Sequence, residues 1–87
     1  MFSHIMVGTN DADRSRQFYN CLFEKEGGTD DKGRTAWRNK GSVFMISNPI
    51  NGEPATSSNG GTIGFNFDSP EEVDAWHARG VEAGGQS

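Results

Sequence analysis

The sequence predicts an α+β fold in which a strand followed by a helix occurs twice along 87 residues. Residues 2–9 and 62–68 alternate between two kinds of side chain, which is typical of strands, whereas 12–22 and 70–85 carry apolar residues at helical spacing. Ile5 aligns with Ile63, Val7 with Phe65 and Phe18 with Trp76, at a constant offset of 58 residues. The identity between the units is low, so two ordinary strand–helix units are the alternative to a repeat.

The first unit begins with the strand over 2–9. Alternation places Ile5 and Val7 on one face of this strand and His4 and Met6 on the other. Asn10 or Asp11 can cap the following helix through a side-chain oxygen. The apolar stripe of that helix would pack on the Ile5 and Val7 face, and it consists of Ala12, Ser15, Phe18, Tyr19 and Leu22.

The residues in the middle of the chain indicate a weak edge strand or loop, then a hairpin, then a long loop. Residues 24–33 are polar and glycine-rich, so we expect a loop or a poor edge strand there. Residues 34–39 and 42–48 alternate on either side of Lys40-Gly41, which predicts an antiparallel hairpin. Residues 49–61 contain two prolines and three glycines, and they predict a long crossover loop between two modules.

The second unit begins with the clearest strand of the sequence, 62–68, which places Ile63, Phe65 and Phe67 on one face. Ser69 is then expected to cap a helix, with Pro70 at its first position and Glu72 completing a capping box. Gly84-Gly85 ends that helix.

Composition limits both the core and the function. Leu, Ile, Val and Phe together make 15 of the 87 residues, fewer than about a fifth, so we expect a thin core and a partner chain. The net charge is −4 and the basic residues are scattered, which argues against nucleic-acid binding. The longest apolar run, Val43–Ile46, is far too short for a membrane span, and no secretory signal is visible. With one cysteine, Cys21, we expect a cytoplasmic protein.

The stretches "FSHIMVGTNDADRSRQFY" and "NGGTIGFNFDSPEEVDAWHARGVEAGG" resemble the openings of the two modules of the vicinal oxygen chelate superfamily, which includes glyoxalase, bleomycin-resistance and extradiol-dioxygenase proteins. The resemblance is strongest to small glyoxalase-like members. It implies β-α-β-β-β modules whose curved sheets enclose a cavity. On this basis 1–48 is a complete first module and 62–87 holds only the first strand and helix of a second, which implies one truncated domain.

The resemblance also implies where a metal site would lie. Metal enzymes of this superfamily take ligands from the first and last strands of each module, and His4 stands at the first of these positions. No Glu, Asp or His occurs from Arg34 to Asn48, and Thr62 stands at the position equivalent to His4. A divalent metal needs about three protein ligands. We therefore expect no cofactor, and His4 remains a single candidate ligand for a metal.

Other candidate residues have structural interpretations. His77, beside Trp76, is expected to pack or face solvent, and Cys21 to lie near the helix–sheet interface. Trp37 could offer a stacking surface to a planar ligand, although core or interface packing is the more common role. The candidate pocket consists of His4, Met6, Trp37 and Met45.

Two classes of function follow. The first is a non-catalytic protein that binds a small hydrophobic or planar molecule in this pocket, or a structural remnant. The second is a metal-dependent lyase, isomerase or dioxygenase of the glyoxalase type, with a site completed by a partner chain. Because the missing strands leave open sheet edges, we expect a homodimer or higher oligomer. Either residues 62–85 of one chain would complete a partner's sheet, or two first modules would pack face to face.

Overall fold

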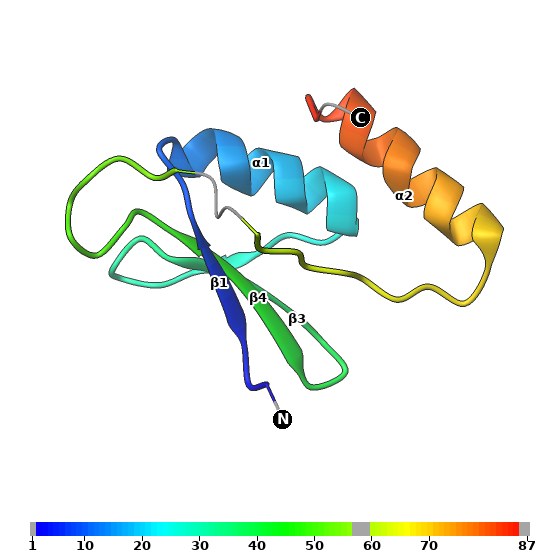
Figure 1. Cartoon of the computed structure of the whole chain (residues 1–87), viewed down its shortest axis with the longest axis horizontal. Coiled ribbons are helices and arrows are strands. Elements are labelled where there is room, and N and C mark those ends of the chain that lie inside the picture. The colour runs from blue at the N-terminus through cyan, green and yellow to red at the C-terminus, as the bar shows by residue number, and fades with distance from the viewer. Residues whose placement is uncertain (1, 57–59, 86–87) are drawn as a thin grey trace.

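The computed structural model describes residues 2–56 and 60–85 (Figure 1). Its elements are β1 (Ile5–Gly8), α1 (Ala12–Phe23), β2 (Gly28–Thr29), β3 (Thr35–Asn39), β4 (Ser42–Ser47) and α2 (Pro70–Glu82). They confirm the predicted α+β class. Residues 57–59 of the predicted loop and 86–87 of the predicted second unit lie outside the described residues. In the described ranges, no helix has the length and apolar character needed to cross a membrane.

The four strands form one sheet in the order β1-β4-β3-β2. β1 runs parallel to β4, and the other neighbouring pairs are antiparallel. α1 lies across one face of the sheet and α2 packs beside α1 (Figure 1). β2 is only two residues long, which confirms the expected poor edge strand. This arrangement is the β-α-β-β-β module that the resemblance implies.

The β3–β4 hairpin turns at Lys40-Gly41, as predicted. Both residues have left-handed backbone angles, with φ of 49° and 87°. Two-residue turns of this kind match the twist of the flanking strands, so they fix the register closely. Asn39 is therefore opposite Ser42, and Trp37 is opposite Phe44.

An aromatic core lies between α1 and the sheet. Trp37, Phe44 and Ile46 are buried, and Val7, Tyr19 and Phe23 pack against them. The Tyr19 ring centroid lies 4.9 Å from that of Phe44. Such ring pairs contribute about 0.5–1.5 kcal/mol beyond the burial of their area.

The indole of Trp37 is tied to the end of α1. Its Nε1 donates to Asn20 Oδ1 at 3.0 Å and to the Lys25 carbonyl at 3.1 Å. The same Asn20 oxygen accepts from the Gly27 amide at 2.8 Å. A buried indole N–H left without an acceptor would cost about 1–3 kcal/mol. These bonds fix how the chain leaves α1 and enters β2.

Both helices begin at the predicted caps. Asp11 Oδ1 accepts from the Arg14 amide at 3.1 Å, which settles the choice between Asn10 and Asp11. Ser69 Oγ accepts from the Glu72 amide at 3.3 Å, and Glu72 Oε2 accepts from the Asp68 amide at 2.9 Å. Each such cap contributes about 1 kcal/mol.

α2 is attached to the first unit by polar and aromatic contacts. Arg79 Nε donates to the Leu22 carbonyl at 3.0 Å, and Arg79 Nη1 lies 3.1 Å from Glu24 Oε1. The Trp76 ring centroid lies 5.5 Å from that of Phe23. Arg79 therefore satisfies one carbonyl at the end of α1, that of Leu22, which the helix itself leaves without a donor.

The predicted strand over 62–68 is not formed within the described chain. The segment is extended but pairs with no strand there. Its aromatic residues pack on rings instead: the Phe65 centroid lies 5.0 Å from Trp76 and 5.9 Å from Phe44. Alternation of apolar and polar residues shows only that one side of the segment packs against other apolar groups. An extended segment can pack in this way without forming hydrogen bonds to a neighbouring strand.

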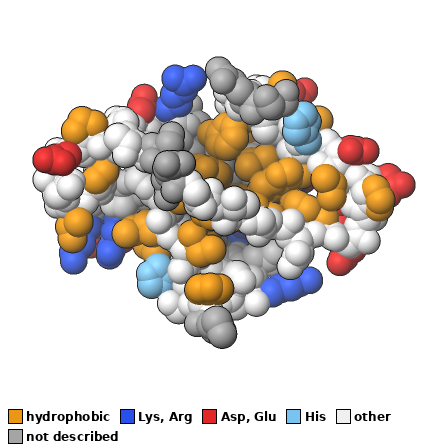
Figure 2. All heavy atoms as spheres, in the orientation of Figure 1, with side chains coloured by type: hydrophobic (Ala, Val, Ile, Leu, Met, Phe, Trp, Pro, Cys, Tyr) orange, Lys and Arg blue, Asp and Glu red, His pale blue; other side chains and the backbone are white. Residues whose placement is uncertain are grey.

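This packing leaves apolar surface. Ile63 and Phe65 are 42% and 41% exposed, and Val73 on α2 is 47% exposed. Figure 2 shows hydrophobic side chains gathered between α2 and the extended segment that precedes it. Contiguous surfaces of this kind are uncommon on monomers.

Gly27 provides the first stability test. A Cβ built on Gly27 would lie 2.6 Å from Thr35 Cγ2 and 2.6 Å from Trp37 Cε2, whereas one on the neighbouring Gly28 meets nothing within 4 Å. We expect Gly27→Ala to lower the free energy of unfolding by about 1–3 kcal/mol, as overpacking does. Gly28→Ala is the matched control and should change it little. Urea unfolding monitored by Trp fluorescence measures both, and equal effects would contradict the packing described.

The second test concerns self-association, because the sequence predicts a homodimer or higher oligomer. We expect sedimentation velocity at micromolar concentration to show a dimer or larger species. Ile63→Lys should shift the distribution toward monomer, because it puts a charge in the exposed apolar surface. Ile50→Lys, at a fully exposed loop position, should not. A wild-type chain that sediments as a stable monomer would refute this expectation.

Candidate functional site

The face of the sheet opposite α1 carries the candidate site. We call it the open face, and it is defined by Met6, Ala36, Arg38, Val43 and Met45. Met45 is the centre of this face, because it is opposite both Met6 on β1 and Ala36 on β3. Met6 is 51% exposed, and Ala36, Val43 and Met45 are half-buried. Strand alternation places these residues opposite the buried Phe44 and Ile46.

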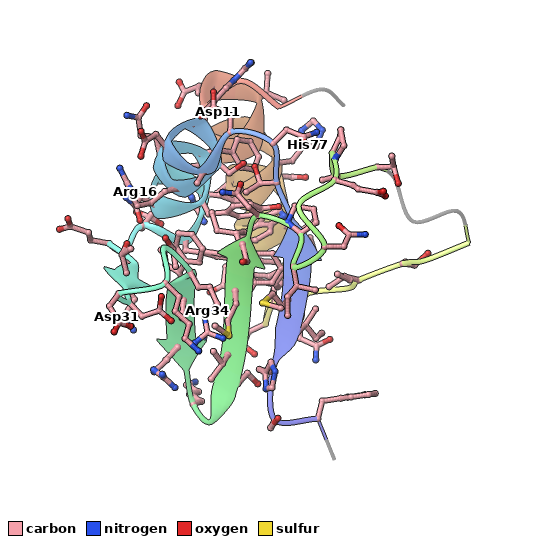
Figure 3. All side chains as sticks on the ribbon, turned by 90° about the vertical axis from the view of Figure 1, so that its left-hand side faces the viewer. Asp11, Arg16, Asp31, Arg34 and His77 are labelled. Carbon is pink, nitrogen blue, oxygen red and sulfur yellow. The ribbon has the colours of Figure 1, made fainter. Side chains whose placement is uncertain are left out.

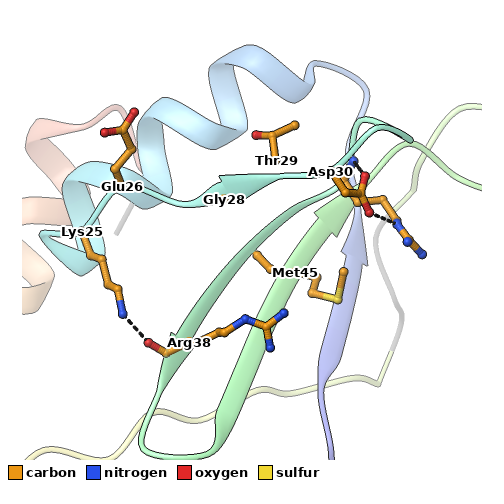
Figure 4. A pocket seen from close by; sticks show the side chains of 9 residues that line it. Lys25, Glu26, Gly28, Thr29, Asp30, Arg38 and Met45 are labelled. Carbon is orange, nitrogen blue, oxygen red and sulfur yellow. Dashed lines mark hydrogen bonds and ion pairs between the residues drawn. The ribbon is translucent and has the colours of Figure 1, made fainter.

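A shallow groove of about 470 Å³ lies on this side of the molecule. Its volume is within the usual range for small-molecule sites, about 300–1,000 Å³. Figure 4 shows it between the β2 connection and the β3–β4 hairpin. The groove is lined by Lys25, Glu26, Gly28, Thr29, Asp30, Arg34, Ala36, Arg38 and Met45.

The structure brings together two of the predicted pocket residues. Met6 and Met45 are neighbours across β1 and β4, and Met45 lines the groove. His4 precedes β1 and is exposed, with Nδ1 2.8 Å from Ser3 Oγ. His4 does not line the groove. It is a histidine at the exposed start of the edge strand.

Trp37 requires a correction. It is 5% exposed and lies in the aromatic core, on the face covered by α1. It therefore shares no face with Met45 and cannot line a pocket there. The reason is the hairpin register, which pairs Trp37 with Phe44. The core interpretation of Trp37 is confirmed, and stacking on a planar ligand is excluded for the open face.

The side chains of the described residues do not form a set of ligands that fits a metal ion. Among these residues, no group of three His, Cys, Asp or Glu side chains gathers where an ion could be held. Thr62 is exposed on the extended segment, and the Cys21 thiol is exposed on α1. His77 is exposed on α2, and Figure 3 shows it away from Arg34 of the groove. No step of chemistry is therefore assigned to a metal here.

The groove gathers charge of both signs. Asp30 Oδ2 accepts from Arg34 Nε at 2.8 Å, and Asp30 Oδ1 accepts from the backbone amides of Arg34 and Lys32 at 2.9 Å. These bonds, above all the one from the Arg34 amide, hold the pKa of the Asp30 carboxyl below its usual value. Asp30 and Arg34 thus neutralise each other at one end of the groove.

The other end is different. Lys25 Nζ donates to the Arg38 carbonyl at 2.6 Å, which brings the ammonium to β3. The Arg38 guanidinium extends across the sheet toward Met45 (Figure 4), and it forms no ion pair with any described residue. The Glu26 carboxylate also lines the groove but points away from Arg38 (Figure 4).

Lys25 and Arg38 are site residues that the sequence patterns above do not indicate. A signal for Arg38 was present: Arg34, Ala36 and Arg38 alternate with Thr35 and Trp37, so they share the face opposite the tryptophan. Lys25 had no such signal, because it belongs to an irregular connection whose course depends on the Asn20 and Trp37 contacts.

Comparison with known proteins agrees on the fold. Residues 1–87 match the sequence profile of the Glyoxalase/Bleomycin resistance protein/Dioxygenase superfamily. The chain is similar to a solved glyoxalase/bleomycin resistance protein from Albidiferax ferrireducens T118, with 44% identity and a TM-score of 0.89. The match covers 97% of this chain and 70% of that one. No curated protein matches the chain.

Metal binding is tested directly by native mass spectrometry. After incubation with Zn²⁺, Ni²⁺, Mn²⁺ and Fe²⁺, we expect no stoichiometric metal, because one histidine supplies too few ligands. A metal that binds one per chain and is lost in His4→Ala would contradict this expectation. His77→Ala serves as the matched control for the loss of an exposed imidazole.

Proposed function

The chain belongs to the glyoxalase/bleomycin resistance/dioxygenase superfamily, and from this membership we propose that it is a non-catalytic protein that binds a small molecule on its open face. The observation that carries the proposal is the pair Met6 and Met45, which presents thioether side chains beside a groove of about 470 Å³. Methionine adapts its shape to different apolar ligands and makes favourable contacts with aromatic rings.

The two faces of the sheet differ in what they pack against, and this difference supports the proposal. The aromatic residues that stabilise the module, Trp37, Phe44 and their neighbours, lie under α1. The open face contributes little to that core, so its apolar residues are available to a ligand. Small-molecule sites combine apolar walls with polar groups that fix the orientation of the ligand. Here Ala36 and Met45 form the apolar part of a groove whose other side chains are mostly polar or charged.

The chemistry of the groove favours binding over catalysis. Its carboxylates are Asp30, which Arg34 engages, and Glu26, which points away from Arg38. Among the described residues that line the groove there is no histidine, cysteine or serine, and the Lys25 ammonium donates to the Arg38 carbonyl. A metal-dependent lyase, isomerase or dioxygenase remains the alternative prediction, and the metal measurement above decides for or against it.

Nuclear magnetic resonance tests the proposed face. We expect the neutral aromatic probe phenylacetamide, titrated into ¹⁵N-labelled protein, to shift the amides of Ala36, Met45 and Met6 in a saturable way. Met45→Asp should abolish these shifts, because it places a charge under the apolar part of the ligand.

The control is Ile50→Asp, which makes the same kind of change at a fully exposed loop position. It should leave the titration unchanged. Shifts confined to α2 and the extended segment, or an undiminished titration with Met45→Asp, would contradict the open face as the binding site.

A further inference from the structure

The charged end of the groove points to the class of ligand. We infer that the open face binds a small molecule with one carboxylate head and an apolar body, with the carboxylate held by Arg38 and Lys25 and the body on Met45 and Met6. This inference rests on the proposed function and specifies the ligand that the same site takes.

The local charge of the groove favours an anionic head group. The chain as a whole has a net charge of −4, yet three of its eight basic residues line this one groove: Lys25, Arg34 and Arg38. Of these three, Arg34 is engaged by Asp30, whereas Lys25 and Arg38 have no carboxylate partner among the described residues. Two carboxylates, Asp30 and Glu26, line the same groove, so its three cations exceed its anions by one charge. Because salt screens charges beyond about 8–10 Å, this local excess decides the potential in the groove more than the acidic residues elsewhere on the chain do.

The geometry of the groove also favours these two residues. The hydrogen bond from the Lys25 ammonium to the backbone carbonyl of Arg38 holds the ammonium beside the strand that carries the guanidinium. That bond uses one of the three ammonium donors and leaves two for a ligand. The planar guanidinium fork matches the two oxygens of a carboxylate, and such bidentate pairs are stronger than ordinary hydrogen bonds.

The position of Arg38 relative to the methionines matches a ligand with one charged end. Its side chain extends over the sheet toward Met45 (Figure 4), and Arg38 and Met45 line the same groove. A wholly apolar ligand on Met45 would remove water from the guanidinium without replacing its hydrogen bonds, which is costly. A carboxylate attached to an apolar body satisfies both parts of the site at once.

Isothermal titration calorimetry with a matched pair of probes tests this inference. Phenylacetate and phenylacetamide have nearly the same shape, but only phenylacetate carries a charge. We expect Arg38→Gln to weaken phenylacetate binding about tenfold or more, while phenylacetamide binding changes by less than about twofold. Arg38→Lys should give an intermediate loss, because lysine keeps the charge without the fork.

The control is Arg16→Gln, which removes the same charge from α1, where Arg16 pairs with Asp13 at 3.1 Å. It should leave both affinities unchanged. Raising NaCl from about 50 mM to about 500 mM should weaken phenylacetate binding only.

The possible outcomes separate the two proposals. If both probes bind equally and Arg38→Gln changes neither, the carboxylate assignment is overturned while the binding face stands. If Arg16→Gln weakens phenylacetate as much as Arg38→Gln, the effect is one of net charge and the assignment to Arg38 fails. If neither probe binds the wild-type chain, the proposed function fails together with this inference.

Discussion

The hydrogen bonds of the Trp37 indole are the constraint on which the rest of the module depends. They join β3 to the end of α1 and to the chain that leaves it, so stretches 12 to 17 residues apart in sequence meet at one nitrogen. Because the indole is 5% exposed, its N–H must find partners inside the protein. The partners are an amide side chain and a backbone carbonyl. The position of Lys25, and with it the charged end of the groove, follows from this requirement.

Most of the fold can be predicted from the sequence, because its signals are local. The caps at Asp11 and Ser69 and the proline at the start of α2 depend on residues within one helical turn, and each occurs where predicted. The weakness of β2 is equally local, since its glycines and polar residues offer nothing to bury. The prediction of a strand over 62–68 was wrong because a strand depends on a non-local feature, a hydrogen-bonded neighbour. The residues within the segment do not indicate whether such a neighbour is present.

The candidate site could be predicted only in part. Met6 and Met45 follow from alternation on two strands, and their adjacency follows from the parallel pairing. Trp37 was placed with them incorrectly, although the two-residue turn at Lys40-Gly41 pairs it with Phe44. Applying that register would have exchanged Trp37 for Arg38 in the pocket. The position of Lys25 could not be predicted, because it follows no periodic pattern. It depends instead on the hydrogen bonds that the Asn20 and Trp37 side chains form with this part of the chain.

The alternation along β3 has an evolutionary consequence. Odd positions, Thr35 and Trp37, are committed to the core, whereas even positions, Ala36 and Arg38, face the groove. If the open face binds a ligand as proposed, substitutions at the even positions would change its specificity while leaving the core residues in place. The turn at Lys40-Gly41 keeps the two sets of positions from being exchanged, so such changes would accumulate one residue at a time.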